Sequence, residues 1–502
     1  MKRFVLAGLL LLTVLRVVLV CLEDPSPREA YYFLCSQQPA SAYFDGPAGT
    51  AFLTGMLSAI SSSDLFGNST SPLLWRLSAP FWALAASLAC FLLVRRFADA
   101  NRAAWAVLAL NLLPIFNECS LRVRPELPAL AFVALGLLFS WKAFEKTSGA
   151  SVIYWAIAGL FFGTASFFSY AAIVAIPGVA LFTLCSPKHR RLVDFVGLFA
   201  LCLVPVPIVW PAMQWNAEQD WIPIAGGTLQ TLWLFSFGGF FFSIQRLIFA
   251  FSPFLLVGLF LAFGLNWREC RGHLRPRFVF LATLPFVGLC VYYSLRGEDP
   301  VFFLLLAASL LMFKAMEWAS AQAYGRVVVG ASLALAVFFS GLTSFMVYEE
   351  GQGWAKAAQE VKDIFLKKSA EEDGLFLIGG TEDTASALGY ALRGDLIPPP
   401  GHPAVYVRES QDISSQFGFW KSYDNFVETG KVVDEYYTEQ KGENPFVNRS
   451  ALYISNESPN DVPQTIKAAF EEVTLLKTLP PCGKNAEPLY IYYCLHYQTL
   501  PL

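Results

Sequence analysis

Apolar runs long enough to cross a bilayer constrain this 502-residue chain more than any other feature. A membrane-spanning helix needs roughly 17–25 mostly apolar residues. Hydrophobic residues make up 55% of the chain, whereas soluble domains contain about 45–50%. We therefore predict a polytopic α-helical membrane protein with eleven spans, at residues 4–22, 73–94, 103–117, 126–141, 152–168, 170–185, 193–213, 249–265, 278–295, 301–316 and 327–347.

Charge divides the chain near Tyr348. Residues 348–502 contain 23 acidic and 13 basic residues, and residues 1–347 contain 16 and 23. We predict a membrane domain at 1–347, with its first outer loop at 23–72, and a soluble domain at 348–502. The net charge of −3 does not indicate a nucleic-acid partner.

The loops between the predicted spans alternate in charge, which predicts their orientation. Cytoplasmic loops carry an excess of Lys and Arg. Arg16 interrupts the first span and no A-x-A site follows it, so we expect an uncleaved span rather than a signal peptide. The N-terminus is then cytoplasmic and the soluble domain lies outside the membrane. The basic loops lie at 95–102, 142–146, 188–191 and 268–277, and the acidic loops at 23–64, 117–124, 214–226 and 296–300.

The soluble domain alternates helical and strand patterns, which predicts a small α/β fold. We expect its last strand at 489–493 and its disulfide candidates at Cys482 and Cys494, which form a bridge or remain free thiols. In the membrane domain, residues 227–246 form either a helix at the outer interface or a twelfth span. We expect helices at 29–38, 50–60, 354–368, 384–392 and 463–472, and further strands at 375–378, 404–407 and 452–455.

Charged residues at the predicted outer boundary are candidates for function, because charge at membrane depth is costly. Arg122 and Arg124, spaced one residue apart, suit a phosphate or diphosphate group. Alternatively they form ion pairs with Glu118 or Glu126. Arg16 could neutralise an acidic neighbour, and Arg76 and Arg246 could reach lipid headgroups. The first outer loop adds Arg28, Glu29, Tyr31, Tyr32 and Asp45.

Several motifs, in order, resemble one enzyme superfamily. The first loop reads SPREAYYF and then YFDGPA, where that family typically reads SPDEAYYW and YYDHPP. This order of motifs resembles the GT-C glycosyltransferases, specifically the bacterial dolichyl-phosphate-mannose–protein mannosyltransferase superfamily, which includes the lipid A aminoarabinose transferase. The other matching segments are VRPELPALAF, FFGTASFFSYAAIVAIPG, VWPAMQWNAEQDW, SQFGFWKSYDNF and SALYIS.

The resemblance implies a GT-C-like membrane fold and an inverting glycosyltransferase of the bacterial inner membrane. Such an enzyme moves a sugar from a polyprenyl-phosphate carrier to an extracytoplasmic glycolipid, glycan or protein. A carboxylate acts on the acceptor hydroxyl, and cations or a divalent metal assist the phosphate. Glu29 and Asp45 are then the catalytic candidates. The expected substrate-binding residues are Arg28, Tyr31, Tyr32, Arg122, Arg124 and Glu126.

The chain departs from the family at the expected catalytic base. Arg28 replaces the family's Asp, and an arginine cannot act as a general base. Three interpretations follow: Glu29 or Asp45 supplies the base while Arg28 contacts phosphate, Asp24 reaches the site, or the site is inactive. An inactive protein of this fold would bind a lipid-linked sugar or a partner protein. A transporter is a third functional class, although no internal repeat is visible.

Overall fold

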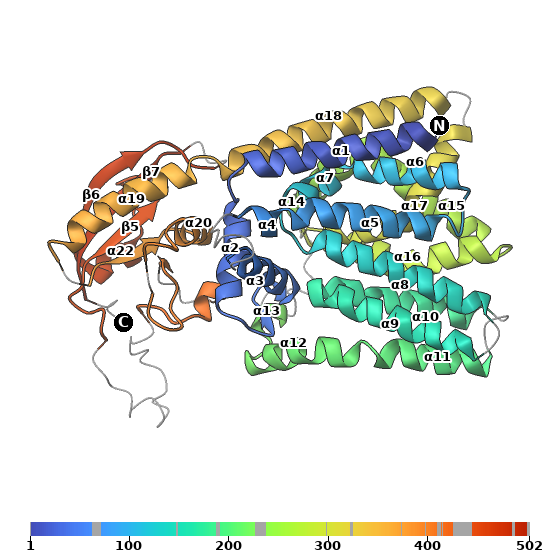
Figure 1. Ribbon diagram of the computed structural model, residues 1–502, viewed down its shortest axis with the longest axis horizontal. Coiled ribbons are helices and arrows are strands. Elements are labelled where there is room, and N and C mark those ends of the chain that lie inside the picture. Colours follow the sequence, from blue (N-terminus) through green and yellow to red (C-terminus); the bar gives the residue numbers. More distant parts are fainter. Residues whose placement is uncertain are drawn as a thin grey trace. The chain divides into compact units, whose positions relative to one another are not determined.

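The fold is described from a computed structural model of the 502-residue chain (Figure 1). Its contacts divide the chain into two compact units. The first contains Met1–Leu22 and Ala40–Phe345, and the second contains Glu23–Pro39 and Met346–Leu502. The segment 23–39, predicted as part of the first outer loop, therefore packs with the soluble tail. The described residues are 2–62, 72–146, 149–186, 191–225, 237–297, 299–321, 325–372, 374–396, 398–408, 413, 415–424, 444–483 and 487–498.

The first unit is a bundle of membrane-spanning helices. Within the described residues, seven helices are long and apolar enough to cross a membrane, and up to ten spans result if each bent helix pair counts as one. The helices are α1 (Lys2–Leu22), α3 (Gly49–Ser61), α4 (Leu73–Arg76), α5 (Ser78–Val94), α6 (Ala100–Asn111), α7 (Pro114–Leu121), α8 (Glu126–Glu145), α9 (Ala150–Phe168), the 3₁₀ helix η2 (Tyr170–Val174), α10 (Ala175–Cys185), α11 (Leu192–Leu203), α12 (Val206–Glu218), α13 (Ile222–Ala225), α14 (Phe237–Phe251), α15 (Pro253–Glu269), α16 (Leu274–Arg296), α17 (Val301–Ala321) and most of α18 (Gly325–Gly351).

The expected polytopic helical fold is confirmed, while the count of eleven spans stays a prediction. The predicted span at 170–185 corresponds to η2 followed by α10, a shorter apolar helix outside the count of seven to ten. Within the predicted segment 227–246, residues 227–236 lie outside the described residues, and α14 forms the remainder.

Proline accounts for the three bent helix pairs, because it lacks the backbone N–H and clashes with the preceding turn. Pro114 begins α7, which lies at 69° to α6. Pro205 caps α12, which lies at 40° to α11. Pro253 begins α15, which lies at 99° to α14. The 99° bend means that α14 runs across the direction of α15, consistent with the expected interfacial helix.

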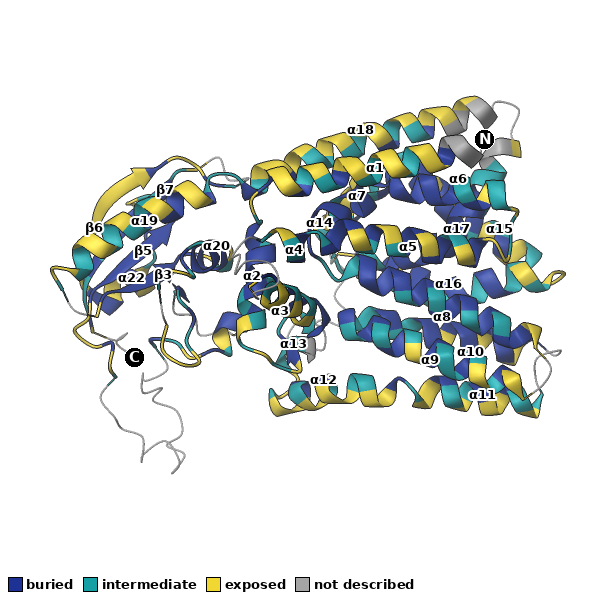
Figure 2. Ribbon diagram, viewed as in Figure 1, coloured by how far each residue is buried: buried dark blue, intermediate teal, exposed yellow. Residues whose placement is uncertain are grey.

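Burial distinguishes the centre of the bundle from its lipid-facing rim (Figure 2). In α8, 78% of the span is buried, whereas only 17% of the α1 span is buried. The exposed side chains of α1 are mostly large and apolar, including Leu6 and Leu10. A solvent-exposed apolar surface of this extent is unusual for a soluble protein, and a surrounding bilayer removes its cost.

The two ends of the bundle differ in charge. The start of α1 lies at the same end of the bundle as the helix ends that flank the basic loops, namely the α5–α6, α8–α9, α10–α11 and α15–α16 ends (Figure 1). The α7–α8 connection, α3, α4 and α13 lie at the opposite end. The predicted division into basic and acidic loops thus matches the two ends of the bundle.

The second unit contains a five-stranded sheet with the order β4-β3-β5-β7-β6. Strand β3 is parallel to β4 and β5, and β7 is antiparallel to β5 and β6. Aromatic side chains, including Phe376 and Tyr497, fill its core. The elements are α2 (Pro27–Gln37), α19 (Trp354–Ser369), β3 (Phe376–Gly379), α20 (Glu382–Ala391), β4 (Tyr406–Val407), the 3₁₀ helix η4 (Gln416–Gly418), β5 (Ala451–Ser455), α22 (Gln464–Ala469), β6 (Phe470–Leu479) and β7 (Leu489–Tyr497).

The sequence prediction missed strand β6. The helix expected at 463–472 ends at Ala469, and the chain then continues as a ten-residue edge strand. Most residues of β6 are exposed, so both faces of this strand are open to solvent. Such a strand does not show the alternation of apolar and polar residues that indicates a half-buried strand. All ten cysteines, each in a described part of the chain, are free, including Cys482 and Cys494.

Close packing of α8 on α9 gives a first testable prediction. A Cβ atom on Gly136 would lie 2.4 Å from the Phe162 ring, whereas a Cβ on Gly288 of α16 would meet open space. Small residues let membrane helices approach closely. We expect Gly136→Leu to lower the stability in detergent by about 1–3 kcal/mol, measured as a reduced Tm.

The matched control is Gly288→Leu, which places the same side chain at an exposed helical position and should leave the Tm unchanged or slightly raised. Equal Tm values for Gly136→Leu and the wild type would contradict the α8–α9 packing.

Candidate functional site

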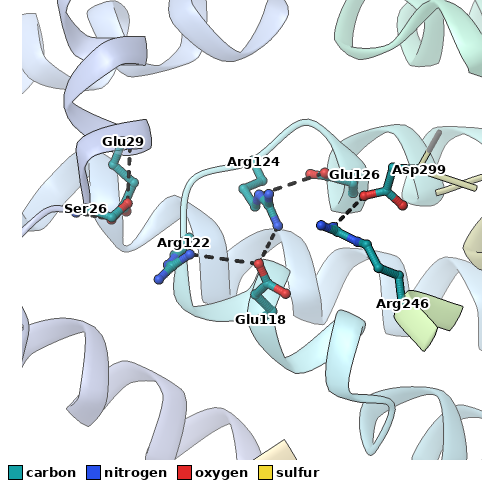
Figure 3. Close-up of polar contacts among 8 residues, drawn as sticks. All are labelled: Ser26, Glu29, Glu118, Arg122, Arg124, Glu126, Arg246 and Asp299. Carbon is teal, nitrogen blue, oxygen red and sulfur yellow. Dashed lines mark hydrogen bonds and ion pairs between the residues drawn. The ribbon is translucent and has the colours of Figure 1, made fainter. Parts of the chain in front are cut away.

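Glu29 fixes the start of helix α2. Its Oε2 atom accepts hydrogen bonds from the Ser26 backbone N–H at 3.0 Å and the Ser26 hydroxyl at 3.2 Å, and the Glu29 N–H donates to the Ser26 Oγ at 3.3 Å. Pro27 occupies the first helical position. This arrangement is a capping box, and Glu29 is 1% exposed (Figure 3). The Ser-x-x-Glu pattern in the sequence indicates this role, which our sequence interpretation did not use.

Arg28 lies among aromatic and acidic groups of the second unit. Its guanidinium is 5.3 Å from the centre of the Tyr31 ring and 5.5 Å from that of Tyr32. Burial raises the pKa of Asp383, at the start of α20, and the negative charge of Glu350 raises it further, whereas the Arg28 charge lowers this pKa. Arg28 therefore partly offsets the effect of burial and of Glu350 on the Asp383 carboxyl.

Asp45 lies on a tight turn in the first unit. Strands β1 (Ala42–Tyr43) and β2 (Gly46–Pro47) pair antiparallel, so Phe44 and Asp45 form a two-residue loop. Gly46 follows with a φ of 143°, a backbone conformation that L side chains rarely adopt. Asp45 is exposed. The turn thus presents this carboxylate at a defined position of the surface.

Four charged residues meet where α7 leads into α8 (Figure 3). We call Glu118, Arg122, Arg124 and Glu126 the α7–α8 charge cluster. Arg124 donates to Glu118 at 2.7 Å and lies 3.9 Å from Glu126, and Arg122 lies 3.9 Å from Glu118. Arg122 is 5% exposed. Both arginines therefore form ion pairs, which was one of the two alternatives given for them. Binding of phosphate by these arginines stays a prediction.

A small cavity adjoins this cluster, between α3, α5, α7 and α8. It has a volume of about 10 Å³, the scale of one water molecule. Its lining includes Thr50, Trp82, Arg124 and Phe168. Within the described residues, Thr50 Oγ1, Trp82 Nε1 and the Oε2 atom of Glu126 are buried without a hydrogen-bond partner. Buried polar groups are usually paired; of these three residues, Thr50 and Trp82 line the cavity and Glu126 does not.

Three other predicted arginines have structural partners. Arg16 donates to the Asn111 side chain at 2.7 Å and to its carbonyl at 2.9 Å, so an amide and not an acid faces it. Arg76 is 2% exposed and donates to the Val20 carbonyl at 2.9 Å, so the headgroup explanation for this residue is wrong. Arg246 pairs with Asp299. Among the described residues, no group of three or more His, Cys, Asp or Glu side chains could hold a metal ion.

The predicted site residues fall into two sets. Arg28, Glu29, Tyr31 and Tyr32 belong to the second unit. Asp45 belongs to the first unit, with the described α7–α8 charge cluster that contains Arg122, Arg124 and Glu126. The sequence interpretation missed the cavity residues Thr50 and Trp82, because single Thr and Trp residues on apolar helices carry no pattern that distinguishes them from packing.

Residues 51–215 match the family model described as dolichyl-phosphate-mannose-protein mannosyltransferase. The chain is 27% identical over 222 residues to the lipid A galacturonosyltransferase RgtD of Rhizobium johnstonii, a match that covers 43% of this chain and only 44% of that protein. The fold resembles ArnT from Cupriavidus metallidurans bound to undecaprenyl phosphate, with a TM-score of 0.61, 15% identity and 98% of each chain covered.

The chain is therefore similar to the GT-C glycosyltransferases, in sequence over residues 51–215 and in its fold. The predicted resemblance is thus confirmed. A further structure with a similar fold is the oligosaccharyltransferase of Archaeoglobus fulgidus, at a TM-score of 0.51 and 11% identity, covering 78% of this chain and 64% of that one.

The charge cluster gives a second prediction. Glu118→Ala removes the carboxylate shared by Arg122 and Arg124. The buried Arg122 guanidinium then loses this counter-charge, while Arg124 keeps Glu126 at 3.9 Å. We expect a loss of about 1–3 kcal/mol, seen as a lower midpoint of thermal unfolding in detergent.

The control is Glu360→Ala, which removes the exposed Glu360–Lys477 pair and should cost less than about 1 kcal/mol. A similar midpoint for both variants would show that the cluster does not depend on Glu118.

Proposed function

We propose that this protein is a membrane glycosyltransferase that transfers a sugar from a polyprenyl-phosphate carrier to an acceptor outside the cytoplasmic membrane. The observation that carries the proposal is the α7–α8 charge cluster, in a chain whose fold resembles ArnT along 98% of its length. Two arginines there share one glutamate, and Glu126 keeps a buried oxygen unpartnered within the described structure. The names of RgtD and ArnT, which concern lipid A and undecaprenyl phosphate, support this substrate class.

The proposed reaction is an inverting displacement. A carboxylate removes the proton of the acceptor hydroxyl, and the oxygen attacks the anomeric carbon of the sugar. The bond from that carbon to the phosphate oxygen breaks on the opposite face, so the configuration inverts. The polyprenyl phosphate leaves with the electron pair, and the guanidinium groups of Arg122 and Arg124 stabilise its charge. Arg28 is a further candidate contact for the phosphate, with Tyr31 and Tyr32 beside it.

Of the two proposed catalytic carboxylates, the geometry favours Asp45 over Glu29. Asp45 is exposed on the β1–β2 turn. Glu29 is buried, and its Oε2 atom is engaged by Ser26. Glu126 is the supporting acid in the proposal. The helix ends that flank the basic loops and the start of α1 share one end of the helix bundle, which supports an inner-membrane protein with a cytoplasmic N-terminus.

A second candidate function is an inactive homologue that binds a lipid-linked sugar or a partner protein. Two observations favour it specifically. Arg28 stands where the family has its expected base, and the neighbouring Glu29 serves the helix cap. A protein that had lost its base would retain the fold and the cluster unchanged.

The purified full-length protein should transfer labelled sugar from a polyprenyl-phosphate donor to a glycolipid extract of outer membranes. We expect Asp45→Asn to reduce transfer about 10²- to 10⁴-fold, the usual contribution of a general base. Asp363→Asn, at an exposed position of α19, is the control and should transfer like the wild type.

Glu29→Gln separates the two roles of residue 29, because glutamine also completes a capping box. We expect near-normal transfer, since Gln retains the oxygen that accepts from Ser26. A loss as large as that of Asp45→Asn would assign the chemistry to Glu29 instead. No transfer by the wild type but transfer by Arg28→Asp would favour the inactive homologue.

A further inference from the structure

The segment 23–39 is held by the second unit, although both of its flanking residues, Leu22 and Ala40, belong to the first. Its helix α2 has 11 residues, and helices shorter than about 12–15 residues are marginal in water without tertiary packing. The packing partner of α2 within the second unit therefore decides whether this helix stays formed.

Helix α20 supplies that partner through an aromatic contact. The rings of Phe33 and Tyr390 meet edge-to-face with their centres 4.9 Å apart. The guanidinium of Arg393 lies 4.0 Å from the centre of the Tyr390 ring and 5.7 Å from that of Phe33, and it donates to the Tyr390 carbonyl at 2.7 Å. Phe33 and Tyr390 are both buried. Such aromatic and cation–π contacts stabilise beyond the area that they bury.

Gly389 of α20 also faces α2. A Cβ atom on Gly389 would lie 3.2 Å from Leu34 Cδ1 of α2, so a leucine at 389 would press on the Leu34 side chain and weaken the packing of α2. On the same helix, Ala30 and Cys35 are almost completely buried. The start of α2 is fixed separately by the Ser26–Glu29 cap.

We propose that α20 holds α2 in place, so that the soluble unit positions Arg28, Tyr31 and Tyr32 for catalysis. The catalytic part of this inference rests on the proposed function. Phe33, Gly389, Tyr390 and Arg393 are positioning residues, because they act through α2.

Hydrogen exchange of the full-length protein in detergent tests the docking directly. We expect Gly389→Leu to make the backbone amides of residues 28–37 (Pro27 has no N–H) exchange about 5- to 30-fold faster, the effect of losing one or two kcal/mol of local stability. Gly394→Leu is the matched control, because a Cβ at Gly394 meets open space, and it should exchange like the wild type. Unchanged exchange in Gly389→Leu would overturn the proposal.

A second substitution that restores slow exchange would show that Gly389→Leu acts through its contact with α2 and not by unfolding the soluble unit. Leu34→Ala in the Gly389→Leu background should restore slow exchange of α2, because it removes the side chain that the new leucine meets. If strand β5 also loses protection in Gly389→Leu, Phe33→Ala provides the second variant, since it leaves α20 unaltered. Rapid exchange confined to 28–37 in Phe33→Ala supports the docking, and wild-type exchange there overturns it.

The positioning role requires a further measurement. In Gly389→Leu, the KM for the polyprenyl-phosphate donor should rise about 5- to 30-fold, with a smaller change in kcat, and Leu34→Ala should reverse the rise. An unchanged KM beside loosened α2 would overturn the positioning role. Absence of transfer by the wild type would count against the proposed function, while the exchange comparison would still support or overturn the docking of α2 on α20.

Discussion

Hydrocarbon offers no hydrogen-bond partners to a polypeptide, so each backbone N–H and C=O group of a span must be satisfied within its own helix. The described architecture of the first unit follows from this constraint and from the places where proline relaxes it. At Pro114, Pro205 and Pro253 a helix stops and a new one begins at an angle. The bend at Pro114 redirects the chain into α7, and the connection from α7 to α8 then carries four charged residues.

The α7–α8 charge cluster is formally neutral, with two arginines and two glutamates. Neutrality suits a resting state, because charge that is largely removed from water needs compensation. An incoming phosphate would compete with Glu118 for Arg124, and the strength of its binding would depend on the displacement of that carboxylate. Within the described structure, the Oε2 atom of Glu126 is unpartnered, and the cavity beside Arg124 has the volume of about one water molecule. The same residues thus form a stable ion-pair group and a candidate site.

The sequence predicted those parts of the fold that have long apolar runs or clear helix-breaking residues such as proline and glycine. Long apolar runs predicted the spans, and Pro39 and Gly46-Pro47 predicted the break between the helices expected at 29–38 and 50–60, which correspond to α2 and α3. Strand β6 was missed because an exposed edge strand shows no apolar alternation. The grouping of residues 23–39 with the tail was also missed, because the contact between Phe33 and Tyr390 joins residues far apart in the chain. Local patterns contain no information about such a pair.

In the candidate site, too, local sequence patterns predicted some residues, whereas others depend on tertiary contacts. Charge type and spacing identified Arg122, Arg124 and Glu126, and the structure brings them together. The Ser-x-x-Glu pattern indicates that Glu29 caps a helix. The sequence analysis instead assigned Glu29 a catalytic role, because the surrounding segment resembles a family motif. Thr50 and Trp82 depend on the shape of a cavity that only tertiary packing creates. Family resemblance therefore located the relevant regions, while assigning a chemical task to each carboxylate required its hydrogen-bond partners.

The discontinuity of the second unit has a consequence for biosynthesis. Helix α2 leaves the ribosome roughly 350 residues before α20, and at about 5–20 residues per second this delay lasts roughly 20–70 s. During that interval the apolar face around Phe33 has no docking partner, although the spans that follow it are already being inserted. The N-terminal cap of Ser26 and Glu29 is available from the start, because it needs only local residues. The N-terminal end of α2 is thus ordered early by local contacts, and the unit that contains it is completed only after α20 and the later strands have been synthesised.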